Sequence, residues 1–188
     1  MAAQDNARRQ KVEHLVSFEI QDYSETKFPD SIFDVVWAIE SLCHAEDKEK
    51  LFTELKRVLK PNGRLIVADS FQSRAMLTSK EQKISDQFFK GFAVYKTQYW
   101  DQLRQELEKT GFRNIRFWNK TEAISKSSRY ILFLCLIFAP AALIVSIIHI
   151  FRPSLTTDVL LGNWRASFAQ WSALRKGLWI YGVYYADK

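Results

Sequence analysis

The chain has 188 residues, of which 47% are hydrophobic and 26% are charged, so it can form one domain with a buried core. Its net charge of +6 is spread along the chain beside acidic residues, which favours a solvated surface over a nucleic-acid site. Attraction to an anionic membrane is a second use for this positive excess. The chain has two cysteines and polar residues at 1–10, so we expect neither a disulfide framework nor a secretory signal.

The first elements in the chain are a predicted helix over residues 2–13 and a predicted strand over Val16–Ile20. The helix rests on good helix formers, and the strand rests on alternating apolar and polar side chains, which are typical of an edge strand. Asp22 closes this strand. By itself, Asp22 is best interpreted as a turn residue whose carboxylate accepts hydrogen bonds from local backbone N–H groups.

Residues 31–69 predict a strand, a helix and a second strand. Phe33–Ala38 is rich in β-branched and aromatic residues, as a strand buried on both faces is. Residues 47–59 place five apolar side chains on one helical face, and a turn at Lys60–Gly63 ends that helix. The second strand lies at 65–68. Such a unit forms a parallel strand pair with a right-handed crossover, and ligands bind at the carboxyl ends of its strands.

Two titratable side chains, Glu40 and His44, follow the first strand at this ligand-binding edge and stand four residues apart. Either can act as a base, a proton relay or an anchor for the polar end of a bound molecule. The alternative is a hydrogen-bonded pair that holds the turn. Asp69, at the end of the second strand, is interpreted as a structural acid. The three histidines stand far apart in the sequence, so we expect no metal site.

The rest of the chain contains further predicted helices and strands in alternation. They are helices at 79–92, 97–110 and 162–177, and strands at 114–118 and 178–185. The helices are predicted by apolar side chains that recur on one face, and the strands by β-branched and aromatic residues or by alternation. Thr97 is the predicted N-cap of the second helix, and Gly177 ends the third.

Residues 130–151 form an apolar run of 22 residues that is flanked by Arg129 and Arg152. This length meets the criterion of about 20 residues for a membrane-spanning helix. Pro140 lies near the middle of the run and predicts a kink. A membrane-embedded or interfacial helix is one interpretation, and a buried helix over a substrate pocket is the other.

The order of these motifs resembles the middle of a class I S-adenosylmethionine-dependent methyltransferase. The resemblance rests on FPDSIFD at 28–34 followed by RVLKPNGRL at 57–65. The stretch WAIESLCH at 37–44 resembles the branch that methylates sterols, tocopherols and other small lipophilic acceptors. The resemblance continues through TGFRNI at 110–115 and LRKGLW at 174–179.

The resemblance implies an α/β fold with an incomplete Rossmann-like sheet and helices on both faces. In the family's strand order, 3-2-1-4-5-7-6, the chain would supply strands 3, 4, 5, 6 and antiparallel 7, with Val16–Ile20 as strand 3. The family's glycine-rich loop after strand 1 and its acid after strand 2 are missing, since the first glycine is Gly63. We therefore expect residues 1–188 to be one N-terminally truncated methyltransferase domain.

For function, the resemblance implies methyl transfer from S-adenosylmethionine to a small lipophilic acceptor such as a tocopherol, quinone or sterol-like molecule. The implied cofactor-binding residues are Asp22 and Tyr23 near the adenine, and Ala38 and Ile39 on the methionine side. Glu40 would then act on the acceptor together with His44.

The same resemblance assigns roles to two longer segments. Residues 70–97 would be a cap insertion over the acceptor pocket, and 130–151 an apolar helix in a membrane or over that pocket. The alternative function is a non-catalytic, membrane-associated fragment that does not bind the cofactor. Either function predicts a location on the cytoplasmic side of a membrane or in the cytoplasm.

Overall fold

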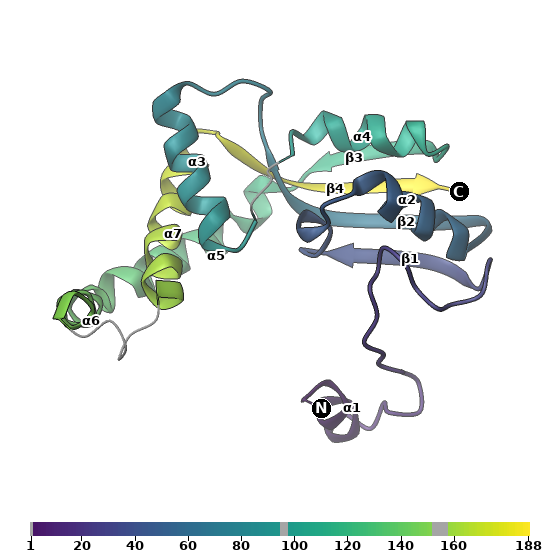
Figure 1. Ribbon diagram of the computed structural model, residues 1–188, viewed down its shortest axis with the longest axis horizontal. Coiled ribbons are helices and arrows are strands. Elements are labelled where there is room, and N and C mark those ends of the chain that lie inside the picture. The colour runs from purple at the N-terminus through teal and green to yellow at the C-terminus, as the bar shows by residue number, and fades with distance from the viewer. Residues whose placement is uncertain (1, 95–97, 152–157) are drawn as a thin grey trace.

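The structure is a computed structural model that describes residues 2–94, 98–151 and 158–188 (Figure 1). In chain order the elements are α1 (Ala2–Arg9), β1 (Phe33–Ile39), the short 3-10 helix η1 (Leu42–His44), α2 (Lys48–Val58), β2 (Leu59–Gln72), α3 (Ser79–Gly91), α4 (Trp100–Lys109), β3 (Arg113–Asn119), α5 (Thr121–Ile137), α6 (Ala139–Phe151), α7 (Asp158–Arg175) and β4 (Trp179–Asp187). The predicted N-cap at Thr97 lies outside the described residues, and α4 begins after Tyr99.

Four strands form one mixed sheet in the order β1-β2-β4-β3. β1 and β2 are parallel, whereas β4 is antiparallel to both of its neighbours. This order confirms the prediction for strands 4, 5, 7 and 6. The turn predicted at Lys60–Gly63 lies within β2 as a bulge, because Leu59 pairs with Phe33 while Arg64 pairs with Val35.

Helices α2 and α4 cover one face of this sheet (Figure 1). Asp47 begins α2 by accepting a hydrogen bond from the backbone N–H of Lys50 at 2.9 Å, which satisfies one of the helix's free donors. The side chains that fill this core come from both helices and from β2 and β4, and they include Leu51, Phe52, Leu65, Val67, Leu103, Leu107 and Tyr184. Of the apolar face predicted at 47–59, Leu51, Phe52 and Leu55 of α2 pack in this core, whereas Leu59 joins it as the first residue of β2.

The opposite face of β1 is open to solvent in the part of the chain that the structure describes. Val35, Trp37 and Ile39 lie on this face and are 38%, 73% and 58% exposed. Residues 10–32, which precede the strand, form turns and irregular backbone and supply no helix to cover it. The prediction that this strand is buried on both faces is therefore wrong for β1, which helices cover on one face only.

The strand predicted at Val16–Ile20 does not form, and that prediction is wrong. The backbone there is irregular, and Ile20 is 85% exposed. A strand needs a partner for its N–H and C=O groups, and β1 pairs only with β2 among the described residues. Figure 1 shows α1 and this segment lying apart from the sheet.

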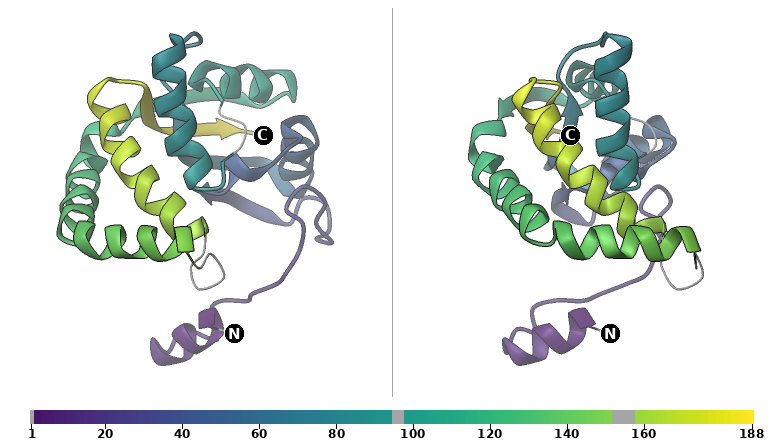
Figure 2. Two further views of the ribbon diagram at one scale, coloured as in Figure 1. Left: turned by 60° about the vertical axis from the view of Figure 1, so that its left-hand side comes forward. Right: turned by 90° about the vertical axis from the view of Figure 1, so that its left-hand side faces the viewer.

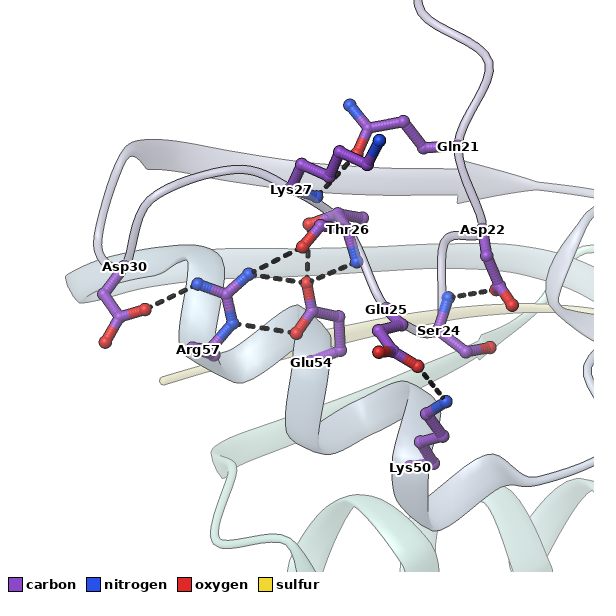
Figure 3. Close-up of polar contacts among 10 residues, drawn as sticks. All are labelled: Gln21, Asp22, Ser24, Glu25, Thr26, Lys27, Asp30, Lys50, Glu54 and Arg57. Atoms are coloured by element: carbon purple, nitrogen blue, oxygen red, sulfur yellow. Dashed lines mark hydrogen bonds and ion pairs between the residues drawn. The ribbon is translucent and has the colours of Figure 1, made fainter.

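Side chains rather than a strand ladder tie residues 21–30 to α2 (Figure 3). Glu54 of α2 accepts hydrogen bonds from the backbone N–H and the hydroxyl of Thr26, at 2.9 and 2.5 Å. Arg57 donates to the two carboxylate oxygens of Glu54 at 2.8 and 2.7 Å, and it pairs with Asp30 at 2.5 Å. This network holds the irregular segment against the helix.

Helices α3, α5, α6 and α7 form a group beyond the end of the sheet at which β1 and β2 finish (Figure 2). α3 and α7 approach closely, since a Cβ atom added to Gly91 would lie 2.2 Å from the Cβ atom of Ala166. Phe88 and Phe89 of α3 pack against Trp179 at the start of β4. The helical group is thereby anchored to the sheet by a second apolar core.

The apolar run 130–151 is divided between two helices. α5 ends at Ile137 and α6 begins at Ala139, with a bend of 57° between them, which confirms the kink predicted from Pro140. No single helix in the described ranges is long and apolar enough to cross a membrane. The bent pair of Thr121–Ile137 and Ala139–Ile147 meets that test together, by length and composition.

Candidate functional site

The site is built where the carboxyl ends of β1 and β2 meet the beginning of β4. Ile39 pairs with Ala68, and two residues further along β2, Ser70 pairs with Tyr181 of β4. The antiparallel direction of β4 therefore brings its first residues to the same edge as the last residues of the parallel strands. This is the edge at which the sequence predicts ligand binding.

Asp69 fixes the backbone at this edge. Its carboxylate accepts hydrogen bonds from the backbone N–H groups of Ser70, at 2.8 Å, and Cys43, at 3.0 Å. The residue is only 4% exposed, and this burial raises the pKa of its carboxyl group. Asp69 thus joins η1 to the end of β2, which is the structural role predicted from the sequence.

The thiol of Cys43 stays protonated in this setting. Burial raises its pKa to about 12, and the charge of Asp69 contributes to the rise. A thiol with such a pKa is a weak nucleophile at neutral pH. Cys43 therefore lines the site as a small, partly buried side chain.

Glu40 lies directly after β1 and adopts a backbone conformation that few residues with a side chain take. Its φ is 49°, and its backbone N–H donates to the carbonyl of Ala68 at 2.8 Å. Local strain of this kind is found mainly at functional sites and turns. The conformation turns the chain from β1 into η1 at the ligand-binding edge.

Tyr181 of β4 lines the same cavity as Glu40. Burial raises the pKa of the Tyr181 phenol to about 12, and the charge of Glu40 and a hydrogen bond with its carboxylate act in the same direction. The phenol is therefore protonated at neutral pH and can donate to that carboxylate. The backbone of Tyr181 is held by Thr121, whose hydroxyl accepts its N–H at 2.9 Å, and by Lys120, whose N–H donates to its carbonyl at 2.7 Å.

A cavity of about 380 Å³ opens beside this pair. Its polar lining includes Glu40, His44, Ser70 and Tyr181, so the structure brings the two predicted catalytic residues to one cavity. Its apolar lining comes from α3, α5 and β4, with Phe88, Phe89, Phe92, Ile124, Ile131 and Trp179. The shape suits a molecule with one polar group and a larger apolar body.

The predicted cap insertion at 70–97 contributes directly to this cavity through its described residues. α3 lies within it, begins at a capping box formed by Thr78 and Glu81, and presents Phe88, Phe89 and Phe92 to the cavity. Residues 95–97 of the predicted segment lie outside the described residues.

The four residues predicted to bind the cofactor lie around the end of β1. The hydroxyl of Tyr23 donates to the carbonyl of Ser41 at 3.4 Å. The segment that follows Val16–Ile20 therefore reaches the ligand-binding edge of the sheet, although no strand forms at 16–20. Asp22 accepts the backbone N–H of Ser24 at 2.8 Å, which is the turn interaction that its residue type predicts. Ala38 packs against the α2–α4 core, whereas Ile39 lies on the open face.

Two parts of the site were not predicted from the sequence. Tyr181 was missed because nothing in the alternation of the last strand distinguishes it from Tyr184 or Tyr185. The resemblance already placed the last strand antiparallel beside strand 5. That position puts the first residues of the last strand, which include Tyr181, at the ligand-binding edge, so Tyr181 could have been predicted from it. Ser127 and Ser128 of α5 were missed because they precede the apolar run and carry no motif.

Known proteins share this fold. Residues 1–67 match the family described as "Methyltransferase domain". Phosphoethanolamine N-methyltransferase 2 of Haemonchus contortus, solved with S-adenosylhomocysteine, superposes with a TM-score of 0.71 over 99% of this chain and 40% of its own, at 18% identity. The chain has the class I methyltransferase fold.

Curated methyltransferases match the chain over shorter stretches. Methyltransferase GfsG of Streptomyces halstedii is 42% identical over 67 residues, which is 36% of this chain and 24% of that protein. Tocopherol O-methyltransferase of Arabidopsis thaliana is 37% identical over 95 residues, which is 48% of this chain and 27% of that protein. The chain thus spans about a quarter of the length of these methyltransferase relatives.

Proposed function

We propose that this methyltransferase-fold chain acts in the transfer of a methyl group from S-adenosylmethionine to a small lipophilic acceptor. The observation that carries the proposal is the cavity at the carboxyl ends of the parallel strands, with Glu40 and Tyr181 on its polar side and aromatic rings on the other. The match of residues 1–67 to a methyltransferase domain supports the choice of reaction.

The described residues fit one side of the methyl donor. Tyr23 and Ile39 present a largely apolar, partly exposed surface at the end of β1, 36% and 58% exposed, against which an adenine ring and an aliphatic chain can lie. Asp22 stands next to Tyr23 and can accept hydrogen bonds from a ligand through the carboxylate oxygen that Ser24 does not use. The bound donor would supply a methyl group on a positively charged sulfur.

Glu40 is the residue that would remove a proton from the acceptor. Its carboxylate lines the cavity near the phenol of Tyr181, which stays protonated because burial raises its pKa to about 12 and can therefore donate a hydrogen bond. His44 lines the same cavity and can bind or relay the proton at a ring nitrogen. The aromatic side chains of α3 exclude water from the remaining part of the cavity and position the acceptor.

The acceptor class follows from the composition of the cavity wall. The cavity wall combines seven apolar side chains, four of them aromatic rings, with nine polar or titratable ones, so a phenol or alcohol on an apolar body suits the site. The similarity to a tocopherol O-methyltransferase points in the same direction. A tocopherol, quinol or sterol-like molecule is the proposed substrate. The chain would methylate it at the cytoplasmic side of a membrane or in the cytoplasm.

A non-catalytic role is the second candidate, and the open face of β1 is the observation that favours it. Trp37 and Ile39 are 73% and 58% exposed there, so the donor would be held from one side by the described residues. In this case the chain would associate with membranes without binding the cofactor.

Calorimetric titration with S-adenosylhomocysteine separates the two candidates. Catalysis predicts saturable heat in the full chain, and methyl transfer from labelled S-adenosylmethionine to a detergent-dispersed tocopherol precursor. Glu40→Gln should lower the turnover number about 100-fold without changing the affinity for S-adenosylhomocysteine. Glu122→Gln, an exposed substitution on α5 outside the cavity, is the matched control and should have no effect. Absence of heat in the full chain would favour the non-catalytic role.

A further inference from the structure

The largest cluster of exposed apolar side chains lies on the last turns of α5 and on α6. We call residues 130–147 the apolar arm. Eight of its large side chains are between 47% and 62% exposed: Tyr130, Phe133, Leu136, Ile137, Phe138, Leu143, Ile144 and Ile147. A contiguous apolar surface of this kind marks an interaction site rather than ordinary protein surface.

The apolar arm is uncharged, and the residues just before it are mainly cationic. No residue in 130–147 is charged, whereas Lys120, Lys126 and Arg129, just before it, are all exposed. Glu122 is the one acidic residue between 120 and 147. An apolar surface bordered by cations complements the acyl region and the anionic headgroups of a phospholipid bilayer. A protein partner would cover the apolar part without requiring this border of cations.

The dimensions of the arm fit one leaflet. Arg129 and Ile137 are eight residues apart on α5, which corresponds to a rise of about 12 Å. One half of the hydrocarbon core of a bilayer is about 15 Å thick. α6 then leaves at a bend of 57°, so the chain turns away at the depth of the leaflet instead of continuing through it.

Figures 1 and 2 show α6 at the end of the helical group away from the sheet. The α2–α4 core therefore does not stand in the way of a flat surface that meets α6. The arm is accessible as a protruding tip, which a bilayer can reach without rearrangement of the sheet.

We propose that the apolar arm inserts into a single leaflet of an anionic phospholipid membrane, with Lys126 and Arg129 at the level of the headgroups. Ile124, Ser127, Ser128 and Ile131 line the cavity from the same helix, immediately beside this boundary. The cavity then opens at the membrane surface, and a lipophilic acceptor reaches Glu40 with its apolar tail still in the leaflet. This last step rests on the proposed methyl transfer, whereas the insertion does not.

Flotation of the full chain with preformed vesicles of phosphatidylcholine and phosphatidylserine at 4:1 tests the insertion. The wild-type chain should float with the vesicles. Replacing Phe133, Leu136 and Phe138 by serine should lower the partition coefficient by about 100-fold or more, because three exposed apolar side chains no longer enter the leaflet. The matched control replaces Leu15, Ile20 and Met76 by serine, which are 72%, 85% and 86% exposed outside the arm, and should float like the wild type.

The cationic border is tested with the variant Lys126→Gln/Arg129→Gln. Its partition coefficient should fall about 25-fold on vesicles that contain phosphatidylserine and should stay unchanged on phosphatidylcholine alone. Trypsin sealed inside the vesicles should leave the bound chain intact. Cleavage by the enclosed trypsin would mean that the chain spans the bilayer, and would overturn single-leaflet insertion.

Two further results would overturn the proposal. One is flotation of the triple-serine variant at the wild-type level. The other is a wild-type chain that does not float and that light scattering shows to be a dimer, if the triple-serine variant is a monomer. The arm would then be covered by a second copy of the chain.

Flotation needs neither cofactor nor turnover, so the two hypotheses can fail separately. A chain that floats but binds no S-adenosylhomocysteine refutes the methyl transfer alone. A chain that methylates an acceptor in detergent but does not float refutes the insertion alone. Delivery through the leaflet further predicts that the triple-serine variant loses activity on acceptors in vesicles and keeps it on acceptors in detergent.

Discussion

Replacement of Glu54 by glutamine should destabilise the fold, because the carboxylate of Glu54 connects the irregular segment 21–30 to α2. Hydrogen bonds from Arg57, and to a smaller extent from Thr26, together lower the pKa of this carboxyl group to about 2, against a partial opposing effect of burial. The substitution keeps the size of the side chain and removes the charge, so the helix face and its apolar core stay unchanged.

The magnitude follows from the size of the pKa change. A fall from 4.5 to about 2 corresponds to roughly 3 kcal/mol at neutral pH if it is converted in full. The side chains of Glu54, Arg57 and Asp30 are 11%, 31% and 77% exposed, so solvent screens part of the interaction. We therefore expect a loss of about 1–2 kcal/mol in the free energy of unfolding at pH 7.

The pH dependence has a definite sign. Because the folded-state pKa of Glu54 is lower than the unfolded value, its stabilising effect is complete above pH 4.5 and is lost as the pH falls toward 2. Urea denaturation of the wild type and of Glu54→Gln should therefore differ most at pH 7 and converge as the pH approaches 2.

Glu108→Gln is the matched control, because Glu108 also pairs with an arginine, Arg104 at 2.9 Å, but both side chains are about half exposed. It should change the free energy of unfolding by less than about 0.5 kcal/mol. An equal effect of the two substitutions, or an effect of Glu54→Gln that does not change between pH 7 and pH 3, would refute the reasoning.

Three further substitutions test the core and the site. Gly182→Ala should lower the free energy of unfolding, measured in urea, by about 1–3 kcal/mol, because the added Cβ would lie 2.4 Å from a ring atom of Phe117. Gly162→Ala is the control and should be neutral or stabilising, because an added Cβ there has no atom within 4 Å. Equal effects of the two substitutions would contradict this explanation. Asp69→Ala should lower stability by about 2–4 kcal/mol, because it leaves two buried backbone N–H groups without an acceptor; an unchanged thermal midpoint would exclude the proposed role. Tyr181→Phe should lower the turnover number about 10–100-fold with S-adenosylhomocysteine affinity unchanged, and full activity would remove Tyr181 from the site.

The elements with strong local patterns were predictable from the sequence. The helix at 47–59 and the strands around it have a capping residue, an apolar face and a glycine-containing turn that all indicate the same structure. The order of the four strands followed from the resemblance of these motifs to a known sheet. For the same reason, Glu40 and His44 could be placed at one edge from their distance to the end of β1.

The remaining features depend on contacts that a local pattern does not contain. Val16–Ile20 alternates as a strand does, but its backbone has no neighbour to pair with in the described structure, so the alternation has no effect. Side chains hold the segment that follows, and the partners Thr26 and Glu54 are separated by 28 residues. Tyr181 reaches Glu40 only because an antiparallel strand is inserted between β2 and β3.

The position of β4 has a consequence for the order in which the sheet can assemble. β4 follows every other strand in the sequence, yet it lies between β2 and β3 and forms the ladder with both of them. During synthesis, β3 has no strand to pair with until residues 179–187 have left the ribosome, although β1 and β2 can already be joined. β3 and β4 therefore join the sheet after β1 and β2, and Tyr181 enters the site together with β4.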